Sequence, residues 1–225
     1  MKNDLISYQE RFRQDGFIQL EVRTEFEREL NEMAQQISVF HQDEWLHIIK
    51  NSIQEQDYFF PIEQTLISYH QSIALHEYQQ GLFCFSFRRI VANHRLLHRA
   101  IFCRIKAFFC AEIFLNFLEK ICQRNLKEIS SFYITRFDQG DFLSTHCDAE
   151  SNIAVVLNLT QRWNPNHGGL TCILDKTRNL VMETLTPTFG SLFIFDTLEK
   201  SIPHFVSMVT VTPEFPRVAI SVRYQ

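Results

Sequence analysis

The sequence predicts one mainly β domain with flanking helices, on the basis of three observations. Short β-branched and aromatic runs recur about every 8–12 residues between residues 126 and 225, separated by turn-forming segments such as DQGD and NPNHGG. Residues 1–125 instead favour helices and the first strands. Phenylalanine makes up 22 of the 225 residues, which suits a pleated sheet with a sizeable core. No linker or repeat divides residues 1–225, so we expect the helices to pack outside one barrel or sandwich.

The N-terminal half is expected to combine helices with two strands. Asp15-Gly16 ends a first helix, and Thr24 with Glu27 matches the capping box that begins a second one. Residues 41–60 show no clear period, and residues 57–61 favour a loop. The expected helices are residues 5–13, 24–37, 62–78 and 96–122, the last broken near Cys110, and the expected strands are residues 17–22 and 81–90.

The C-terminal half is expected to supply most of the sheet. Residues 135–148, TRFDQGDFLSTHCD, predict a strand, a turn and a second strand. The expected strands are residues 130–137, 152–160, 170–174, 180–184, 191–195, 204–211 and 217–224.

Composition and charge exclude several function classes. The formal net charge of −4 gives no sign of a nucleic-acid or anionic-membrane binder. No apolar run reaches the roughly 18–20 residues of a membrane span, and the polar N-terminus is unlike a secretory signal, so we expect a cytoplasmic protein. The six cysteines form no CxxC pair, which argues against a zinc ribbon or a thioredoxin-type redox site. We expect reduced thiols that are mostly buried.

A histidine and a carboxylate two residues apart define the candidate chemistry. On a strand, His146 and Asp148 point to the same face, and a third ligand from a distant strand would complete a two-histidine, one-carboxylate triad for non-haem iron. The spacing alone is unspecific, because His41 and Asp43 share it. We interpret residues 41–43 as a solvated polar segment, since no strand alternation follows.

Two residues near the C-terminus extend this constellation. His204 begins a predicted strand and is the candidate third ligand, although a structural histidine is the alternative. Arg217 opens the last strand, where Ser221 and Arg223 share its face by parity. A buried arginine needs an anionic partner, which a dicarboxylate would supply through a bidentate fork. An arginine that simply reaches water is the other interpretation.

Four segments together resemble the core of the Fe(II)/2-oxoglutarate-dependent oxygenases, and within them the prolyl-hydroxylase branch with its ribosomal-protein, hypoxia-sensing and bacterial members. The segments are RFDQGDFLSTHCD, VVLNLTQRWNPNHGGL, TPTFGSLFIFDTLEKSIPHFV and PRVAISVRY. The resemblance covers residues 130–225 and implies a double-stranded β-helix (jelly roll) core, with residues 1–125 as helical support and first strands.

This resemblance also implies the roles of single residues. His146, Asp148 and His204 would bind Fe(II), Arg217 would bind the distal carboxylate of 2-oxoglutarate with Ser221 assisting, and O2 would be the third reactant, with ascorbate as a further cofactor. A carboxylate at position 148 favours hydroxylation over halogenation. The implied substrate is a prolyl residue of a protein or an amino-acid-like small molecule, with no nucleic-acid or membrane partner.

Some positions depart from the family. Phe137 and Val156 stand where relatives carry tyrosines, so a hydroxyl donor to the co-substrate is absent or comes from elsewhere. Arg223 stands where a tryptophan is usual; it faces the cavity and an acidic substrate, or it reaches solvent. Three alternatives stay open: a binding or scaffold protein without turnover, an oxygenase tailoring a small natural product, and a cupin-type enzyme, against which Arg217 argues.

Overall fold

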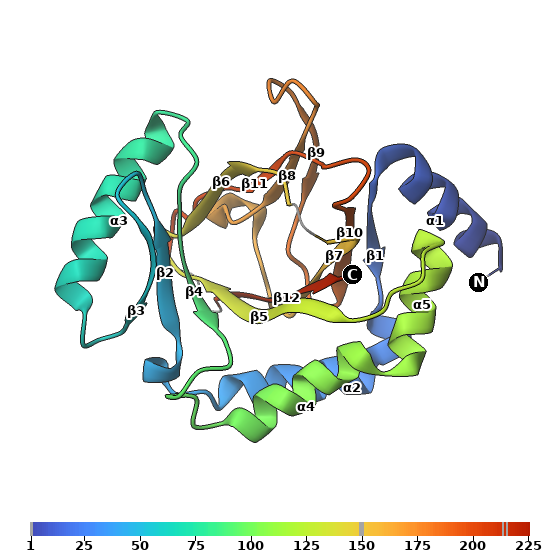
Figure 1. Ribbon diagram of the computed structural model, residues 1–225, viewed down its shortest axis with the longest axis horizontal. Coiled ribbons are helices and arrows are strands. Elements are labelled where there is room, and N and C mark those ends of the chain that lie inside the picture. Colours follow the sequence, from blue (N-terminus) through green and yellow to red (C-terminus); the bar gives the residue numbers. More distant parts are fainter. Residues whose placement is uncertain (1, 149–150, 213, 215) are drawn as a thin grey trace.

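The computed structural model describes residues 2–148, 151–212, 214 and 216–225. Its described strands form one antiparallel sheet that bends into a nearly closed barrel (Figure 1). The sheet order is β1 (Phe17–Glu21), β10 (Ser191–Asp196), β7 (Ile153–Asn158), β12 (Arg217–Tyr224), β5 (Ile129–Phe137), β4 (Phe85–Ile90), β6 (Phe142–His146), β11 (His204–Val206), β8 (Thr171–Leu174) and β9 (Val181–Leu185).

The barrel consists of two facing layers. The first layer holds β1, β10, β7, β12 and β5, and the second layer holds β6, β11, β8 and β9. Strand β4 pairs with both β5 and β6, so it joins the layers along one side. This arrangement confirms the expected double-stranded β-helix core.

Three helices cover the outer face of the first layer. They are α2 (Arg23–Ser38), α4 (Arg99–Cys110) and α5 (Glu112–Cys122), and Figure 1 shows α2 and α4 beneath β5 and β12. Ile220 and Val222 of β12 point outward into a large apolar cluster with helix residues such as Leu30. Residues of the other parity, including Arg217, therefore face the barrel interior.

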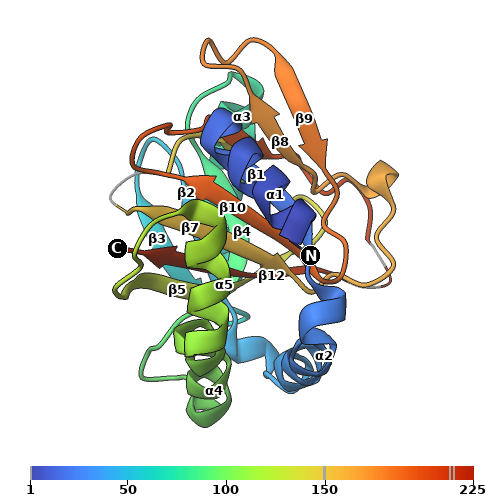
Figure 2. The same cartoon turned by 90° about the vertical axis from the view of Figure 1, so that its right-hand side faces the viewer.

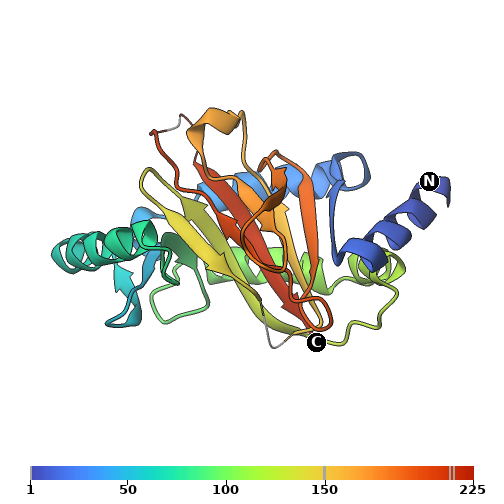
Figure 3. The same cartoon turned by 90° about the horizontal axis from the view of Figure 1, so that it is seen from above.

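The remaining helices lie at opposite ends of the molecule, with the barrel strands between them (Figure 3). Helix α1 (Lys2–Asp15) packs on α5 and β1, and α3 (Gln64–Gln79) packs on β2 (Leu46–Lys50), which pairs with β3 (Glu55–Phe59) and β4. The hairpin of β8 and β9 projects beyond the barrel (Figure 2). No described helix is both long enough and apolar enough to cross a membrane.

The structure corrects two local predictions. Residues 57–61, predicted as a loop, hold the end of β3, and the unassigned stretch before them holds β2. Thr24 does not cap α2, which begins at Arg23 and is kinked at Phe26 (φ −131°). The side chain of Glu21 accepts a hydrogen bond from the backbone N–H of Arg23 (3.1 Å), so it satisfies one of the N–H groups at the start of the helix that a capping residue would otherwise satisfy.

All six cysteines are free thiols. Cys84, Cys122 and Cys172 are buried, Cys147 is half-buried, and Cys103 and Cys110 are exposed. The expectation of mostly buried cysteines therefore holds for half of them.

Candidate active site

Two neighbouring strands bring the three candidate ligands together. His146 ends β6, His204 begins β11, and the two residues are direct cross-strand partners. Asp148 follows β6 by two residues. One donor atom from each side chain lies within 4.8 Å of the others, and His146 Nε2 is 3.8 Å from Asp148 Oδ1. This set of one carboxylate and two imidazoles could hold a divalent metal ion.

Backbone contacts orient both imidazoles. The Nδ1 atom of His146 lies 3.0 Å from the carbonyl of Ser144, and Nδ1 of His204 lies 2.9 Å from the carbonyl of Ile202. A carbonyl accepts only, so Nδ1 carries the hydrogen and Nε2 keeps its lone pair. Such contacts are typical of the groups that position metal-binding histidines.

The charge states also suit a metal site. Burial and then the neighbouring His204 lower the pKa of His146 to about 4, so this imidazole is neutral at pH 7. Burial works to raise the pKa of Asp148, but Arg223 and the two histidines outweigh it and hold that pKa below its usual value. An ionised carboxylate and a neutral imidazole are the forms that bind a metal.

The second His-x-Asp pair lies elsewhere. His41 and Asp43 are exposed at a short 3-10 helix, Gln42–Glu44, as their solvated reading predicted. Among the described residues, the candidate metal group holds His146, Asp148 and His204 and neither member of this pair.

A cavity of about 70 Å³ lies between the two layers, beside the histidines. Arg217 lines it and is buried (3% exposed), stacked 4.6 Å above the Phe137 ring. Its Nη2 donates to the hydroxyl of Thr171 (3.3 Å), while its Nε finds no partner among the residues that the structure describes. Burial lowers the pKa of Arg217 to about 10, well above neutrality. A buried cation with an unmet donor suits a carboxylate ligand.

The Gly168–Gly169 turn makes room for Arg217. Both glycines have positive φ (73° and 63°), and a Cβ at position 169 would meet Cδ of Arg217 at 3.1 Å. A glycine is therefore needed where this turn passes the guanidinium.

Other predicted residues fall on the cavity wall. Ser221 lines the cavity between its cross-strand partners Tyr133 and Val156, which line it together with Phe137. The hydroxyl beside Arg217 comes from Thr171, which the sequence reasoning did not single out. Its position on β8, facing inward by parity, was the available signal.

Arg223 faces the cavity instead of solvent. Its Nη2 donates to Oδ1 of Asp148 at close range, and its Nη1 donates to the hydroxyl of Tyr133 (3.1 Å). Its side chain is 25% exposed. By parity the sequence put Arg223 on the same face as Arg217, but it left open whether the side chain reaches solvent and did not predict the pairing with Asp148.

A wider cleft of about 820 Å³ continues outward from His146, Asp148 and Arg223. Phe85, Phe87 and Tyr133 are among the aromatic residues that line it. Trp163 is not among them; its indole donates to the carbonyl of Gly168 (2.9 Å) and packs on His167.

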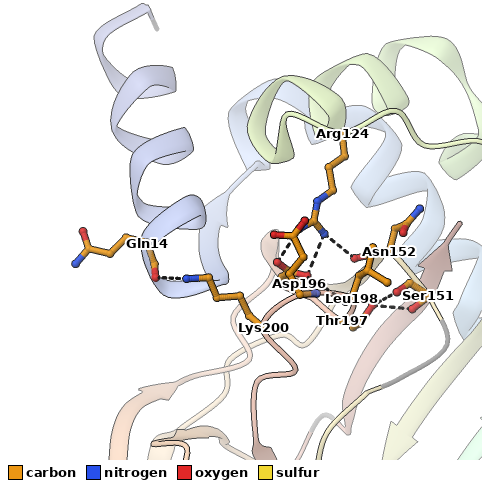
Figure 4. A network of polar contacts seen from close by, with 9 residues as sticks. Gln14, Arg124, Ser151, Asn152, Asp196, Thr197, Leu198 and Lys200 are labelled. Atoms are coloured by element: carbon orange, nitrogen blue, oxygen red, sulfur yellow. Dashed lines mark hydrogen bonds and ion pairs between the residues drawn. The ribbon is translucent and has the colours of Figure 1, made fainter.

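A polar network holds two segments at this end of the barrel, residues 151–152 just before β7 and residues 196–197 at the end of β10 (Figure 4). Arg124 donates to both carboxylate oxygens of Asp196 (3.0 and 2.8 Å) and to the carbonyl of Asn152 (3.1 Å). The hydroxyls of Ser151 and Thr197 lie 2.8 Å apart. Arg124, which follows α5, thereby ties both segments to that helix.

Known proteins share parts of this architecture. Residues 132–225 match the model of the 2OG-Fe(II) oxygenase superfamily. No curated protein matches the chain. Among solved structures, a 2OG-Fe(II) oxygenase family oxidoreductase from Burkholderia pseudomallei is similar at 14% identity and a TM-score of 0.67, over 98% of this chain and 90% of that one.

Two further structures share the fold at lower similarity. A prolyl-4-hydroxylase from Pseudomonas putida has 14% identity and a TM-score of 0.52, with 98% of both chains covered. The non-heme alpha ketoglutarate dependent epimerase SnoN of nogalamycin biosynthesis has 11% identity and a TM-score of 0.55, with 100% of this chain and 83% of that one covered.

A double-stranded β-helix with two histidines and a carboxylate at one end of its cavity defines a class of non-haem iron oxygenase. Residues 132–225 match the model of the 2OG-Fe(II) oxygenase superfamily, and this match indicates a 2-oxoglutarate-dependent oxygenase. The superfamily implies Fe(II), 2-oxoglutarate and O2. The donor set and the unmet Nε of Arg217 fit a metal ion and a dicarboxylate.

Proposed function

We propose that the protein hydroxylates a C–H bond of its substrate, with His146, Asp148 and His204 holding Fe(II). The observation that carries this proposal is the close grouping of three donor atoms whose imidazoles are oriented by backbone carbonyls. When bound, Fe(II) with 2-oxoglutarate and O2 supplies the oxidant that replaces a substrate hydrogen by a hydroxyl, leaving succinate and CO2.

The protein's residues bind and orient the reactants. Arg217 and Thr171 bind the distal carboxylate of 2-oxoglutarate, because they place donors on the cavity wall that no described carboxylate satisfies. Ser221 assists from the same face of β12. Apolar walls such as Phe193 and Val206 exclude water from the cavity.

The whole chain acts as one domain in this proposal. Residues 126–225 carry the ligands, and residues 1–125 supply the helical support and β4, whose Phe85 and Phe87 line the cleft. The substrate is a prolyl residue or an amino-acid-like molecule. SnoN, with a similar fold, is named as an epimerase, so a small natural product is the second candidate.

Anaerobic visible absorption tests the site. Fe(II) and then 2-oxoglutarate are added to wild type, Asp148→Ala and Asp43→Ala, which alters the other His-x-Asp pair. We expect a charge-transfer band that needs both ligands, in wild type and Asp43→Ala but not in Asp148→Ala.

Turnover is measured separately. Succinate formed with a candidate substrate distinguishes an oxygenase from a binding protein that keeps the site without chemistry. A band of equal strength in Asp148→Ala, or its absence from folded wild type, would contradict the proposed ligands.

A further inference from the structure

The mouth of the cavity carries a second arginine whose carboxylate partner is a candidate metal ligand. Arg223 contacts Asp148 through Nη2 and the hydroxyl of Tyr133 through Nη1. Within the described part of the chain, no other carboxylate pairs with it. If Asp148 gives its charge to a metal ion, Arg223 faces a dication without a compensating anion.

The other charged side chains of the cleft cannot supply that anion. Arg89 pairs with Asp57 at 2.8 and 2.9 Å, and Glu55 pairs with Lys50 at 3.3 Å. Each of these pairs is neutral by itself. Once Asp148 is shared with a metal ion, these other charged side chains of the cleft therefore do not offset the charge on Arg223.

A charge balance of the loaded site shows what is missing. Fe(II), Arg217 and Arg223 together carry four positive formal charges, whereas Asp148 and the 2-oxoglutarate dianion carry three negative ones. With a neutral residue at position 223 the same site would balance. One further negative charge is therefore favourable beside Arg223, and a substrate anion can reach it because the side chain lies on the cleft wall.

We propose that Arg223 binds a carboxylate of the substrate, so that the substrate is a molecule with a free carboxylate and not an internal prolyl residue. This inference rests on the proposed function. An arginine fork suits a carboxylate through two parallel hydrogen bonds. On binding, the guanidinium exchanges part of its contact with Asp148 for the substrate anion, while Tyr133 keeps it at the cavity mouth.

The rest of the cleft suits the apolar part of such a substrate. Phe85, Phe87 and Leu143 line the same cleft as Arg223, and Tyr133 adds a ring with a polar edge. An aliphatic or aromatic body would contact these side chains while its carboxylate faces Arg223. The reacting C–H bond would then lie near His146 and Asp148, which line the same cleft.

Calorimetry under anaerobic conditions tests this inference on the protein loaded with Fe(II) and 2-oxoglutarate. The probes are free amino acids, N-acetyl amino acids and short peptides, each as the acid and as its C-terminal amide. We expect one of these acids to bind about tenfold to a hundredfold more tightly than its amide. In Arg223→Gln the two forms should bind within about twofold, and Arg223→Lys should keep part of the preference.

Arg89→Gln is the matched control, since it removes an arginine of the same cleft whose charge Asp57 already neutralises. It should keep the preference for the acid. The three probe classes distinguish a free amino acid, an acylated acid and a peptide C-terminus as the source of the carboxylate.

The charge-transfer band separates failure of this inference from failure of the proposed function. If the band forms but no acid outbinds its amide, the inference is overturned and the oxygenase assignment stands. If Arg223→Gln weakens acid and amide equally, or weakens 2-oxoglutarate alone, Arg223 acts on Asp148 or on the co-substrate instead. If wild type forms no band, both proposals fall.

Discussion

Arg217 shows how much a single buried residue constrains function. Its guanidinium is stacked on Phe137 and touches Thr171, yet its Nε has no partner in the described structure. An unmet buried donor costs about 1–3 kcal/mol and more when charged, so a ligand that satisfies it gains that much. Satisfying this donor therefore contributes part of the free energy with which an anion would bind at Arg217.

Replacing Arg217 should separate co-substrate binding from metal binding. In Arg217→Gln we expect the 2-oxoglutarate concentration at half-maximal absorption to rise about tenfold to a hundredfold, because a charge-assisted contact is lost. In Arg217→Lys this 2-oxoglutarate concentration should rise less, since lysine keeps the charge but not the planar fork. Fe(II) affinity, read by quenching of protein fluorescence, should stay unchanged. An unaltered 2-oxoglutarate titration would contradict the assigned role.

Parity and pairing set the limit of prediction at the residue scale. The spacing of His146 and Asp148, and the face shared by Arg217 and Ser221, follow from the two-residue period of a strand. The contact of Arg223 with Asp148 does not, because Asp148 follows β6 in the other layer, and β12 does not pair with that strand in the described sheet.

At the element scale, a buried polar cluster ties the turn between β5 and β6 to the first strands. Asp141 accepts the backbone N–H of Asp138 (2.9 Å) and the hydroxyl of Ser86 (3.3 Å), and His47 Nε2 lies 2.7 Å from that hydroxyl. Burial raises the pKa of Asp141 to about 8 and lowers that of His47 to about 4. Near pH 7, both groups are mainly neutral.

Asp141 should make stability depend on pH. Its folded-state pKa lies above the unfolded value of 3.8, so its contribution is fully present below about pH 4 and is lost as the pH rises to about 8. Asp141→Asn lacks this titration. Between about pH 4 and pH 8, we expect the unfolding free energy of Asp141→Asn to increase relative to that of wild type by up to about 1.4 kcal/mol per pH unit.

Urea unfolding of both proteins across this pH range measures the difference, with equal urea dependences as the control for an unchanged fold. If the two stability curves run parallel, Asp141 is ionised throughout and the assigned pKa is wrong.

The strands that were predicted from the sequence differ physically from β2 and β3, which were not. The runs after residue 126 alternate because one face packs on helices and the other lines the cavity, as in β12. Strand β2, LHIIK, has four buried residues in a row and so shows no alternation. Strand β3, EQDYF, begins with exposed polar residues and pairs with β2 alone among the described strands, so its sequence resembles a loop. Pairing with neighbours, and not local preference, makes these two segments strands.

At the scale of the whole molecule, the apolar packing is unevenly distributed. The largest apolar cluster lies between the first layer and the helices, where Leu30, Leu118 and Ile220 are fully buried. The barrel interior holds two smaller clusters, one around Phe193 and one around Phe137, with the cavity beside them. The outer face thus stabilises the fold, while the interior keeps room and unmet polar groups for ligands.

This division predicts that ligands stabilise the whole chain. A ligand that binds the folded state alone adds about 2.7 kcal/mol at a hundredfold excess over its dissociation constant. For a chain of this size, each 1 kcal/mol raises Tm by about 2–4 °C. Mn(II), used because it does not oxidise readily, should therefore raise Tm by about 5–10 °C, and 2-oxoglutarate should add a second increment in its presence.

Two variants test whether these increases in Tm depend on Asp148 and Arg217. Asp148→Ala should lose the increases in Tm from both Mn(II) and 2-oxoglutarate, because the metal loses a ligand and 2-oxoglutarate then has no metal to bind. Arg217→Gln should keep the metal increment and lose most of the 2-oxoglutarate increment, since its change lies at the far carboxylate. An Mn(II) shift that persists in Asp148→Ala would place the metal outside the cavity. Because these shifts need no turnover, they test the site even if the protein only binds its ligands.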